Sequence, residues 1–182
     1  NMPKFPIADG ATAFDKLSPA ASVKKLLEKA GVACTDTLGL INITEAQYNE
    51  IKQFTDNLVV GAQSEYQKYR KCYNWITANV KYGEKYDNGS YVNNDPYPVF
   101  TTKKAVCQGY ALAYSRLLSE LGIESYVVSS DEMNHAWNLI NLDGNWFHVD
   151  CTWDDPTNGY EVDFCRGGFV RHDYFLRSDS EF

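Results

Sequence analysis

An Asp-Gly dipeptide between two strand-like segments is the feature that most restricts how this chain can fold. Asp143-Gly144 separates the segment HAWNLINL from the segment NWFHVD. Because Asp-Gly suits a two-residue turn, we expect an antiparallel hairpin in which the residues flanking the dipeptide form the first pair. This register places His135 and Asp150 on one face as diagonal neighbours, about 7 to 8 Å apart at the backbone. A loop one residue longer would put them on opposite faces. The sequence therefore predicts a histidine–carboxylate pair.

His148 is the alternative to His135 as a general base. It lies on the same predicted face as Asp150, two residues before it. Its position in the hairpin interior is further from the strand end where a cleft would open, so we favour His135. His172 lies in a polar segment near the end of the sequence and is expected to be unrelated. The remaining histidines and cysteines fit no familiar ligand spacing, and we predict no metal site.

Cys107 is the candidate nucleophile because it is predicted to begin a helix that ends at Gly122. The apolar residues of this helix form one stripe: Tyr110, Ala111, Tyr114, Leu117, Leu118 and Leu121. The unpaired N–H groups and the positive end of the helix dipole at its start favour a thiolate. Lys103 and Lys104 are expected to favour it further. None of the other four cysteines has this predicted setting.

The rest of the chain predicts an appendage and a main domain. Residues 1–40 are expected to form a helical appendage, with a helix from about 18 to 30, and residues 41–182 the main domain. Two matches to the capping-box pattern, Thr44 with Gln47 and Ser64 with Gln67, predict two helices, at about 45–60 and 65–79. The second helix presents an aromatic stripe, Tyr66, Tyr69, Tyr73 and Ile76, which we assign to the core.

Polar and turn-forming residues dominate the segment between the second of these helices and Cys107. The stretch from Val80 to Ala105 is dense in Gly, Asn, Asp and Pro, and we expect it to be irregular. Its tyrosines, Tyr82, Tyr86, Tyr91 and Tyr97, are candidates for the mouth of a cleft. Further strands are expected from Glu124 and over Tyr174 to Leu176.

Charge and hydrophobicity exclude several classes of function. The 182 residues carry a net charge of -7, and no run of Lys or Arg exceeds two residues, so a nucleic-acid partner is not expected. No apolar run approaches the roughly 20 residues of a membrane-spanning helix. The five cysteines contain no CxxC pair, which argues against a zinc ribbon or a dense disulfide framework.

Three segments around Cys107, His135 and Asp150 resemble a known family. The segments are AVCQGYA, NHAWN and WFHVDCTWDDP, and they occur in the order found in the transglutaminase-like core domain of many bacterial surface and secreted proteins. The segments NWITANVKY and DYFLRSD add to a likeness that covers roughly residues 45–180. Residues 1–40 lie outside it.

The resemblance implies an α+β, papain-like fold in which a nucleophile helix packs on an antiparallel sheet, here with extra N-terminal helices. It implies that Cys107 is the nucleophile, that His135 is the base and later the acid, and that Asp150 orients the imidazole. No cofactor is implied, and the calcium sites of animal transglutaminases are not recognisable. An extracellular or cell-surface location is implied.

The substrate cleft is expected to include three further residues. Asn134 and Trp137 flank His135 within the second segment, and Tyr97 precedes the nucleophile helix. The backbone N–H of Cys107 is expected to hold the oxyanion together with a side-chain donor, for which Tyr97 is a candidate.

These expectations describe a thiol-dependent enzyme that transfers an acyl group from protein or peptide amides through a cysteine thioester. Water as acceptor gives hydrolysis and an amine gives cross-linking, and the sequence leaves both open, as it does the oligomeric state. The alternative is a non-catalytic binding or structural module with the same fold. Arylamine acetyl transfer or deglycosylation on a related scaffold is disfavoured, because nothing suggests a coenzyme A or glycan site.

Overall fold

The structure is a computed structural model that describes residues 33–35, 44–93, 95–155 and 171–182. The predicted helix at 18–30 lies outside these residues, as does most of the predicted appendage.

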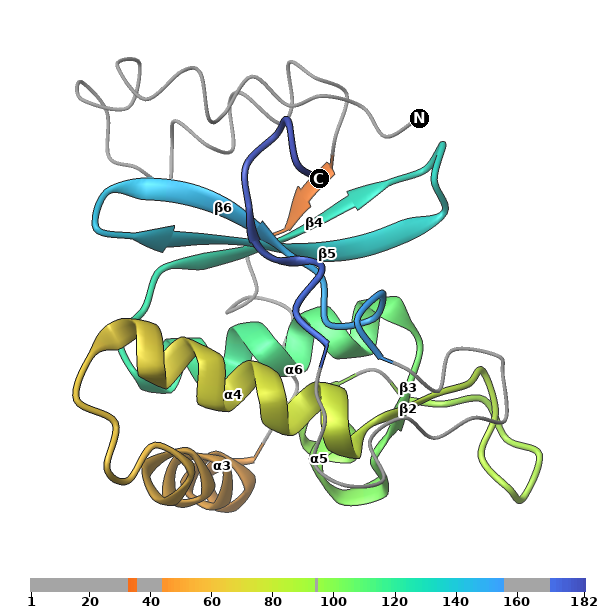
Figure 1. Ribbon diagram of the computed structural model, residues 1–182. Coiled ribbons are helices and arrows are strands. Elements are labelled where there is room, and N and C mark those ends of the chain that lie inside the picture. The colour runs from red at the N-terminus through yellow and green to blue at the C-terminus, as the bar shows by residue number, and fades with distance from the viewer. Residues whose placement is uncertain (1–32, 36–43, 94, 156–170) are drawn as a thin grey trace.

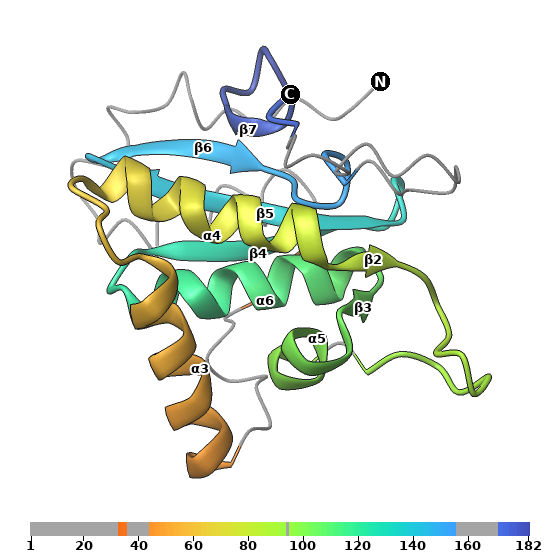
Figure 2. The same ribbon diagram turned by 60° about the horizontal axis from the view of Figure 1, so that its bottom comes forward.

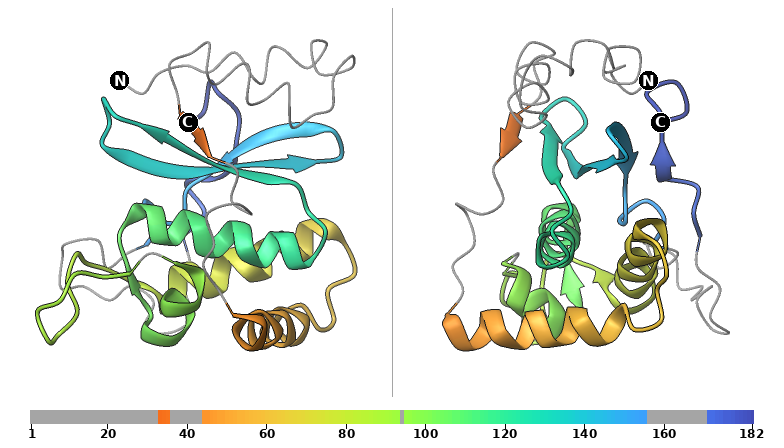
Figure 3. Two further views of the ribbon diagram at one scale, coloured as in Figure 1. Left: turned by 180° about the vertical axis from the view of Figure 1, so that it is seen from behind. Right: turned by 90° about the vertical axis from the view of Figure 1, so that its left-hand side faces the viewer.

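Five strands of the described residues form one antiparallel sheet in the order β1-β4-β5-β6-β7 (Figure 1). The strands are β1 (Ala33–Thr35), β4 (Ser125–Ser130), β5 (His135–Leu142), β6 (Asn145–Val149) and β7 (Phe175–Arg177). β1 pairs with β4, so the sheet includes three residues from the segment predicted to be an appendage. β1 and β7 lie at opposite edges of the sheet (Figure 3).

Four helices are described: α3 (Glu45–Leu58), α4 (Glu65–Asn79), α5 (Pro96–Thr102) and α6 (Cys107–Glu120). α6 packs on β4 and β5, and α4 lies beside α6 on the same side of the sheet (Figures 2 and 3). This arrangement, in which the helix that begins at Cys107 packs on an antiparallel sheet, confirms the predicted α+β fold.

The starts of α3 and α4 follow the predicted capping residues. Thr44 and Gln47 form a complete capping box at α3. At α4, Ser64 accepts a hydrogen bond from the Gln67 N–H, whereas the Gln67 side chain accepts from Gln63 N–H. The predicted box at α4 is therefore only half formed.

The aromatic stripe of α4 belongs to the core, as predicted. Tyr69, Tyr73 and Ile76 are buried and pack with residues of α6 and the sheet. Tyr66 is more exposed, although its ring contacts Phe175.

The segment from Val80 to Ala105 is more regular than predicted. It contains α5 and a short parallel pair, β2 (Lys81–Tyr82) with β3 (Lys104–Ala105). Pro96 at the first position of α5 is a sequence signal that could have indicated this helix. The β2–β3 pair joins residues far apart in the sequence, which local patterns cannot reveal, and it fixes the chain just before Cys107.

The β5–β6 hairpin has the predicted register. Leu142 pairs with Asn145, and the ladder continues to Asn138 and Val149. Asp143 and Gly144 have φ angles of 52° and 82°, as a type I′ turn requires. The ladder ends before Asp150, whose N–H donates to the carbonyl of Tyr174 instead. The hairpin thus brings His135 and Asp150 to the end of the sheet where α6 begins.

Candidate active site

Cys107 is the first residue of α6, directly after the extended N-cap Val106. Its half-buried side chain packs against a small apolar cluster that includes Ala111 and Ala136. The first N–H groups of a helix have no intrahelical partner, and they favour a negative charge placed beside them. The predicted position of this cysteine at a helix N-terminus is confirmed.

His135 and Asp150 form the predicted pair. His135 Nε2 lies 2.5 Å from Asp150 Oδ2, and both side chains are almost completely buried. Because Nε2 is bonded to the carboxylate, the other ring nitrogen, Nδ1, is left for the thiol of Cys107, with which His135 also forms a side-chain hydrogen bond. The three groups predicted from separate segments therefore meet in one place.

A tight turn after β6 fixes the carboxylate of Asp150. Its Oδ1 accepts hydrogen bonds from the N–H groups of Thr152 and Trp153 at 2.9 and 3.1 Å. The Asp150 carbonyl accepts a hydrogen bond from the Tyr73 hydroxyl, which also contacts the Asp154 carboxylate. Helix α4 thus anchors the turn, and Oδ2 of Asp150 is directed at the imidazole.

The thiol and the imidazole shift each other's pKa. Burial opposes the thiolate of Cys107, but the hydrogen bond and charge of His135 and the backbone amides of Ala136 and Gln108 outweigh it, so the pKa of Cys107 is lowered. Burial likewise opposes the imidazolium, but Asp150 and Cys107 raise the pKa of His135 to about 9. Both shifts favour a thiolate beside an imidazolium.

The two lysines before the helix do not have the predicted role. The groups that lower the pKa of Cys107 are His135 and backbone amides, not Lys103 or Lys104. Lys104 instead forms an ion pair with Asp87 at 3.2 Å. Its long side chain reaches a carboxylate of the preceding loop, which the sequence could not show.

The other described thiols have the opposite electrostatic setting. Cys72 and Cys151 are free and buried, as part of the core. Burial raises the pKa of Cys72 to about 12 and raises that of Cys151 well above its ordinary value. Cys107 differs from both in being half-exposed with a lowered pKa.

Trp153 is a site residue that the sequence reasoning missed. Its ring stacks on the His135 imidazole with centroids 4.7 Å apart and planes 6° apart. It therefore covers one face of the imidazole. The signal was present, because Trp153 lies in the same segment as Asp150, three residues later.

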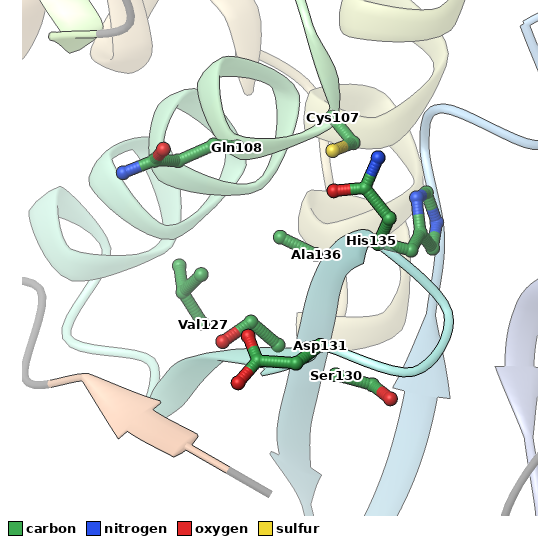
Figure 4. A pocket seen from close by; sticks show the side chains of 9 residues that line it. Cys107, Gln108, Val127, Ser130, Asp131, His135 and Ala136 are labelled. Carbon is green, nitrogen blue, oxygen red and sulfur yellow. The ribbon is translucent and has the colours of Figure 1, made fainter.

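A cavity of about 290 Å³ opens beside the thiol. It lies between the start of α6, the end of β4 and the turn to β5 (Figure 4). The lining residues are Cys107, Gln108, Val127, Ser129, Ser130, Asp131, Asn134, His135 and Ala136. Asn134 therefore lies where the sequence predicted it, in the wall of a cleft next to the thiol.

The sequence profile of the Transglutaminase-like superfamily matches residues 52–151, which include Cys107, His135 and Asp150. The chain belongs to the transglutaminase-like superfamily.

Curated relatives of this transglutaminase-like chain include animal proteins. It is 26% identical over 121 residues to the kyphoscoliosis peptidase of Mus musculus, an alignment that covers 57% of this chain and 18% of the mouse protein. It is 29% identical over 123 residues to the Lim and transglutaminase domain protein ltd-1 of Caenorhabditis elegans, covering 58% of this chain and 17% of that protein. The chain thus spans only a small part of these relatives. The expected bacterial origin and extracellular location stay predictions.

Two solved structures are similar to this chain over part of their length. One is a protein assigned as a cysteine protease from Cytophaga hutchinsonii, with a TM-score of 0.47, 22% identity and coverage of 62% of this chain and 40% of that chain. Another is a TGase, with a TM-score of 0.49, 18% identity and coverage of 89% of this chain and 52% of that chain.

Two residues predicted to line the cleft of this transglutaminase-like domain lie elsewhere. The Tyr97 hydroxyl donates to Glu50 Oε2 at 2.8 Å, because α5 packs its tyrosine toward α3. Trp137 is only 1% exposed and stacks on His135 and Phe182. Residues two apart on a strand share one face, so Trp137 lies beside His135 but one repeat further along the strand, where it is buried and does not line the cavity.

His148, the rival base, lies away from the thiol in the interior of the sheet. It is 1% exposed, and it accepts a hydrogen bond from Trp137 Nε1 and contacts Asp179 through Nε2, each at 3.0 Å. His172 contacts Asn74. The structure thus brings His135, and not His148, to the cavity.

No helix in the described ranges is long and apolar enough to cross a membrane. Within those same ranges, no three His, Cys, Asp or Glu side chains converge as a metal site would require.

Proposed function

We propose that this domain is a thiol-dependent acyl-transfer enzyme that acts on protein or peptide amides through a thioester on Cys107. The observation that carries the proposal is the convergence of the Cys107 thiol, the His135 imidazole and the Asp150 carboxylate at a cavity. The lowered pKa of Cys107 favours the nucleophilic thiolate form. Family membership agrees with this chemistry.

In the first half of the reaction, the Cys107 thiolate attacks the carbonyl carbon of the amide. The carbonyl π electrons move to oxygen, and the resulting tetrahedral intermediate collapses with loss of the amine. His135 Nδ1 gives the departing nitrogen a proton, and the acyl group remains as a thioester on the sulfur. Asp150 holds the ring with Nδ1 toward the sulfur through its bond to Nε2.

In the second half, His135 accepts a proton from the acceptor as the acceptor attacks the thioester carbon. The carbon–sulfur bond breaks and the thiolate is restored beside the imidazolium. Water yields a carboxylic acid and an amine yields a new amide, so the two outcomes differ only in the acceptor.

The oxyanion is assigned to the N–H of Cys107 and the side-chain amide of Asn134. The first N–H groups of a helix have no intrahelical partner, and Asn134 is an exposed amide in the cavity wall. Tyr97 cannot serve, since its hydroxyl is bonded to Glu50 on α3. Losing one such donor typically costs on the order of a hundredfold in rate.

The test uses wild type and Cys107→Ala with a peptide library, with and without a primary amine. Mass spectrometry then identifies cleaved, deamidated or amine-bearing peptides. We expect such products only from the wild type. Alkylation by iodoacetamide in the folded protein should occur at Cys107 and spare Cys72 and Cys151, which serve as internal controls.

The outcome also separates the enzyme from a binding module. If Cys107 is alkylated selectively and no peptide is altered, a non-catalytic module that retains the fold becomes the better description. If Cys107→Ala still produces every product, the thioester mechanism is wrong.

A further inference from the structure

Among the residues that the structure describes, Asp131 is the only one that lines the cavity with a carboxylate. It follows the last residue of β4 and begins the turn that leads to His135. In Figure 4 its carboxylate lies on the side of Val127, and the Ser130 hydroxyl points the other way. The acid therefore belongs to the same space as the thiol.

The turn holds its shape without using the Asp131 carboxylate. The Asp131 carbonyl accepts a hydrogen bond from Asn134 N–H at 3.1 Å, and Ser130 Oγ accepts one from Met133 N–H at 3.3 Å. Across the part of the chain that the structure describes, no hydrogen bond or ion pair engages the carboxylate. Its negative charge is thus available to a ligand.

Among the described residues, no Lys or Arg lines the cavity to neutralise this charge. A thiolate on Cys107 and an imidazolium on His135 offset each other, and the buried Asp150 carboxylate behind His135 adds a negative charge. Asp131 is the solvent-exposed acid of the cavity wall and reinforces this negative sign. The cavity volume of about 290 Å³ is near the lower end of the roughly 300–1,000 Å³ typical of small-molecule pockets, and so suits one side chain.

We propose that Asp131 determines substrate specificity by binding the guanidinium or ammonium group of an Arg or Lys side chain in the acyl-donor peptide, close to the amide that Cys107 attacks. This inference rests on the proposed acyl-transfer function. It assigns the acid a role in binding and orientation, and no proton or acyl group passes through it.

The direct test compares peptides that differ only in charge. Peptides from the library that are turned over are resynthesised with citrulline for Arg or norleucine for Lys, and kcat/KM is measured. For the wild type we expect the charged peptide to be preferred roughly tenfold, a modest effect because Asp131 is exposed to solvent and salt screens the pair. Asp131→Asn should remove the preference while turnover of the neutral peptide stays within about twofold.

Glu132→Gln is the matched control. Glu132 is the next residue, carries the same charge and is exposed, but does not line the cavity. It should leave the preference intact. Equal losses in Asp131→Asn and Glu132→Gln would mean that general surface charge, and not Asp131, attracts the substrate, and this would overturn the inference.

A second readout does not depend on amide turnover. Cationic 2-(trimethylammonium)ethyl and anionic 2-sulfonatoethyl methanethiosulfonates each convert the thiolate to a mixed disulfide and release methanesulfinate. The wild type should react faster with the cationic reagent, Asp131→Asn should lose most of this bias, and Asp131→Lys should reverse it. An unchanged ratio in all three proteins would refute the inference.

The two arms separate this inference from the proposed function. If peptides are turned over without charge preference, the acyl-transfer proposal stands and the role of Asp131 is wrong. If no peptide is turned over, the thiosulfonate ratio still decides whether Asp131 selects cations at the cavity.

Discussion

Two histidine–aspartate pairs lie in the same sheet, and they differ in the third group that each histidine meets. His135 contacts Asp150 at 2.5 Å and shares its other nitrogen with the Cys107 thiol beside the cavity. His148 contacts Asp179 at 3.0 Å, and its Nδ1 accepts a hydrogen bond from the indole of Trp137. The thiol of Cys107 can give its proton to the ring of His135, whereas the indole N–H of Trp137 can only donate a hydrogen bond to His148.

Residue type alone therefore does not distinguish the two pairs. The pair at His135 has a reactive partner and an opening to solvent, so it suits chemistry. In the other pair, His148 is 1% exposed and stacks against the ring of Phe182, so this pair suits a role in stabilising the fold. Phe182 also stacks on Trp153, which stacks on His135, so an aromatic stack connects the two pairs.

The largest expected effect is the loss of activity in His135→Ala. General acid–base catalysis contributes roughly 10²- to 10⁴-fold, and we expect amide turnover to fall by that factor. The measurement is kcat/KM on a peptide identified in the library, with far-ultraviolet circular dichroism to check the fold. Retention of full activity would show that the His135 pair is not the reactive one.

The pH dependence of thiol reactivity comes next in size. Because the pKa of Cys107 is lowered, alkylation by iodoacetamide should reach half its maximal rate below the roughly pH 8.5 of an ordinary thiol. In His135→Ala the hydrogen bond and charge of His135 are lost while the backbone amides of Ala136 and Gln108 remain, so the midpoint should move to higher pH. Amide turnover in the wild type should decline above about pH 9, where His135 loses the proton that the leaving amine needs. Equal midpoints in the two proteins would contradict the coupling between thiol and imidazole.

The third prediction concerns stability at the other pair. Asp179→Ala removes the acceptor that contacts the buried His148 Nε2, and removing one partner of a buried hydrogen bond costs about 1–3 kcal/mol. We expect the free energy of unfolding, measured with urea, to fall by this amount, with the alkylation rate of Cys107 nearly unchanged in the folded protein. A large drop in alkylation rate without a loss of stability would mean that the His148 pair also takes part in the chemistry.

The smallest expected effect tests the aromatic stack that connects the pairs. Aromatic contacts contribute about 0.5–1.5 kcal/mol, so Trp153→Ala should lower kcat by no more than about tenfold, with little change in KM. Trp153→Phe keeps a ring over His135 and should recover much of the loss. Failure of Phe to recover any activity would assign Trp153 a role beyond stacking on the imidazole.

The parts of the site that could be predicted depend on local signals. An Asp-Gly dipeptide favours one type of two-residue turn, and this turn fixes the pairing of every residue along the two strands. The approach of His135 to Asp150 could therefore be predicted from their spacing. The helix start at Cys107 followed from periodicity in the same way. The family resemblance selected the same three residues.

Other features depend on contacts between segments far apart in the sequence. The Tyr97 hydroxyl bonds to Glu50, 47 positions away, and Lys104 to Asp87 in the preceding loop. Asp131 showed no pattern in the sequence, because a single acid in a turn is ordinary until a cavity and a thiol lie beside it. Such assignments require the positions of all the neighbours.

The sequence by itself determined the antiparallel hairpin, the helix that begins at Cys107 and the identities of the three groups, since these depend on local backbone preferences and strand alternation. Only the tertiary structure decided which histidine meets a thiol, which acid lies in the cavity and which cysteines are inert. Those properties depend on burial and on a third partner, and both are set by packing between α6, α4 and the sheet.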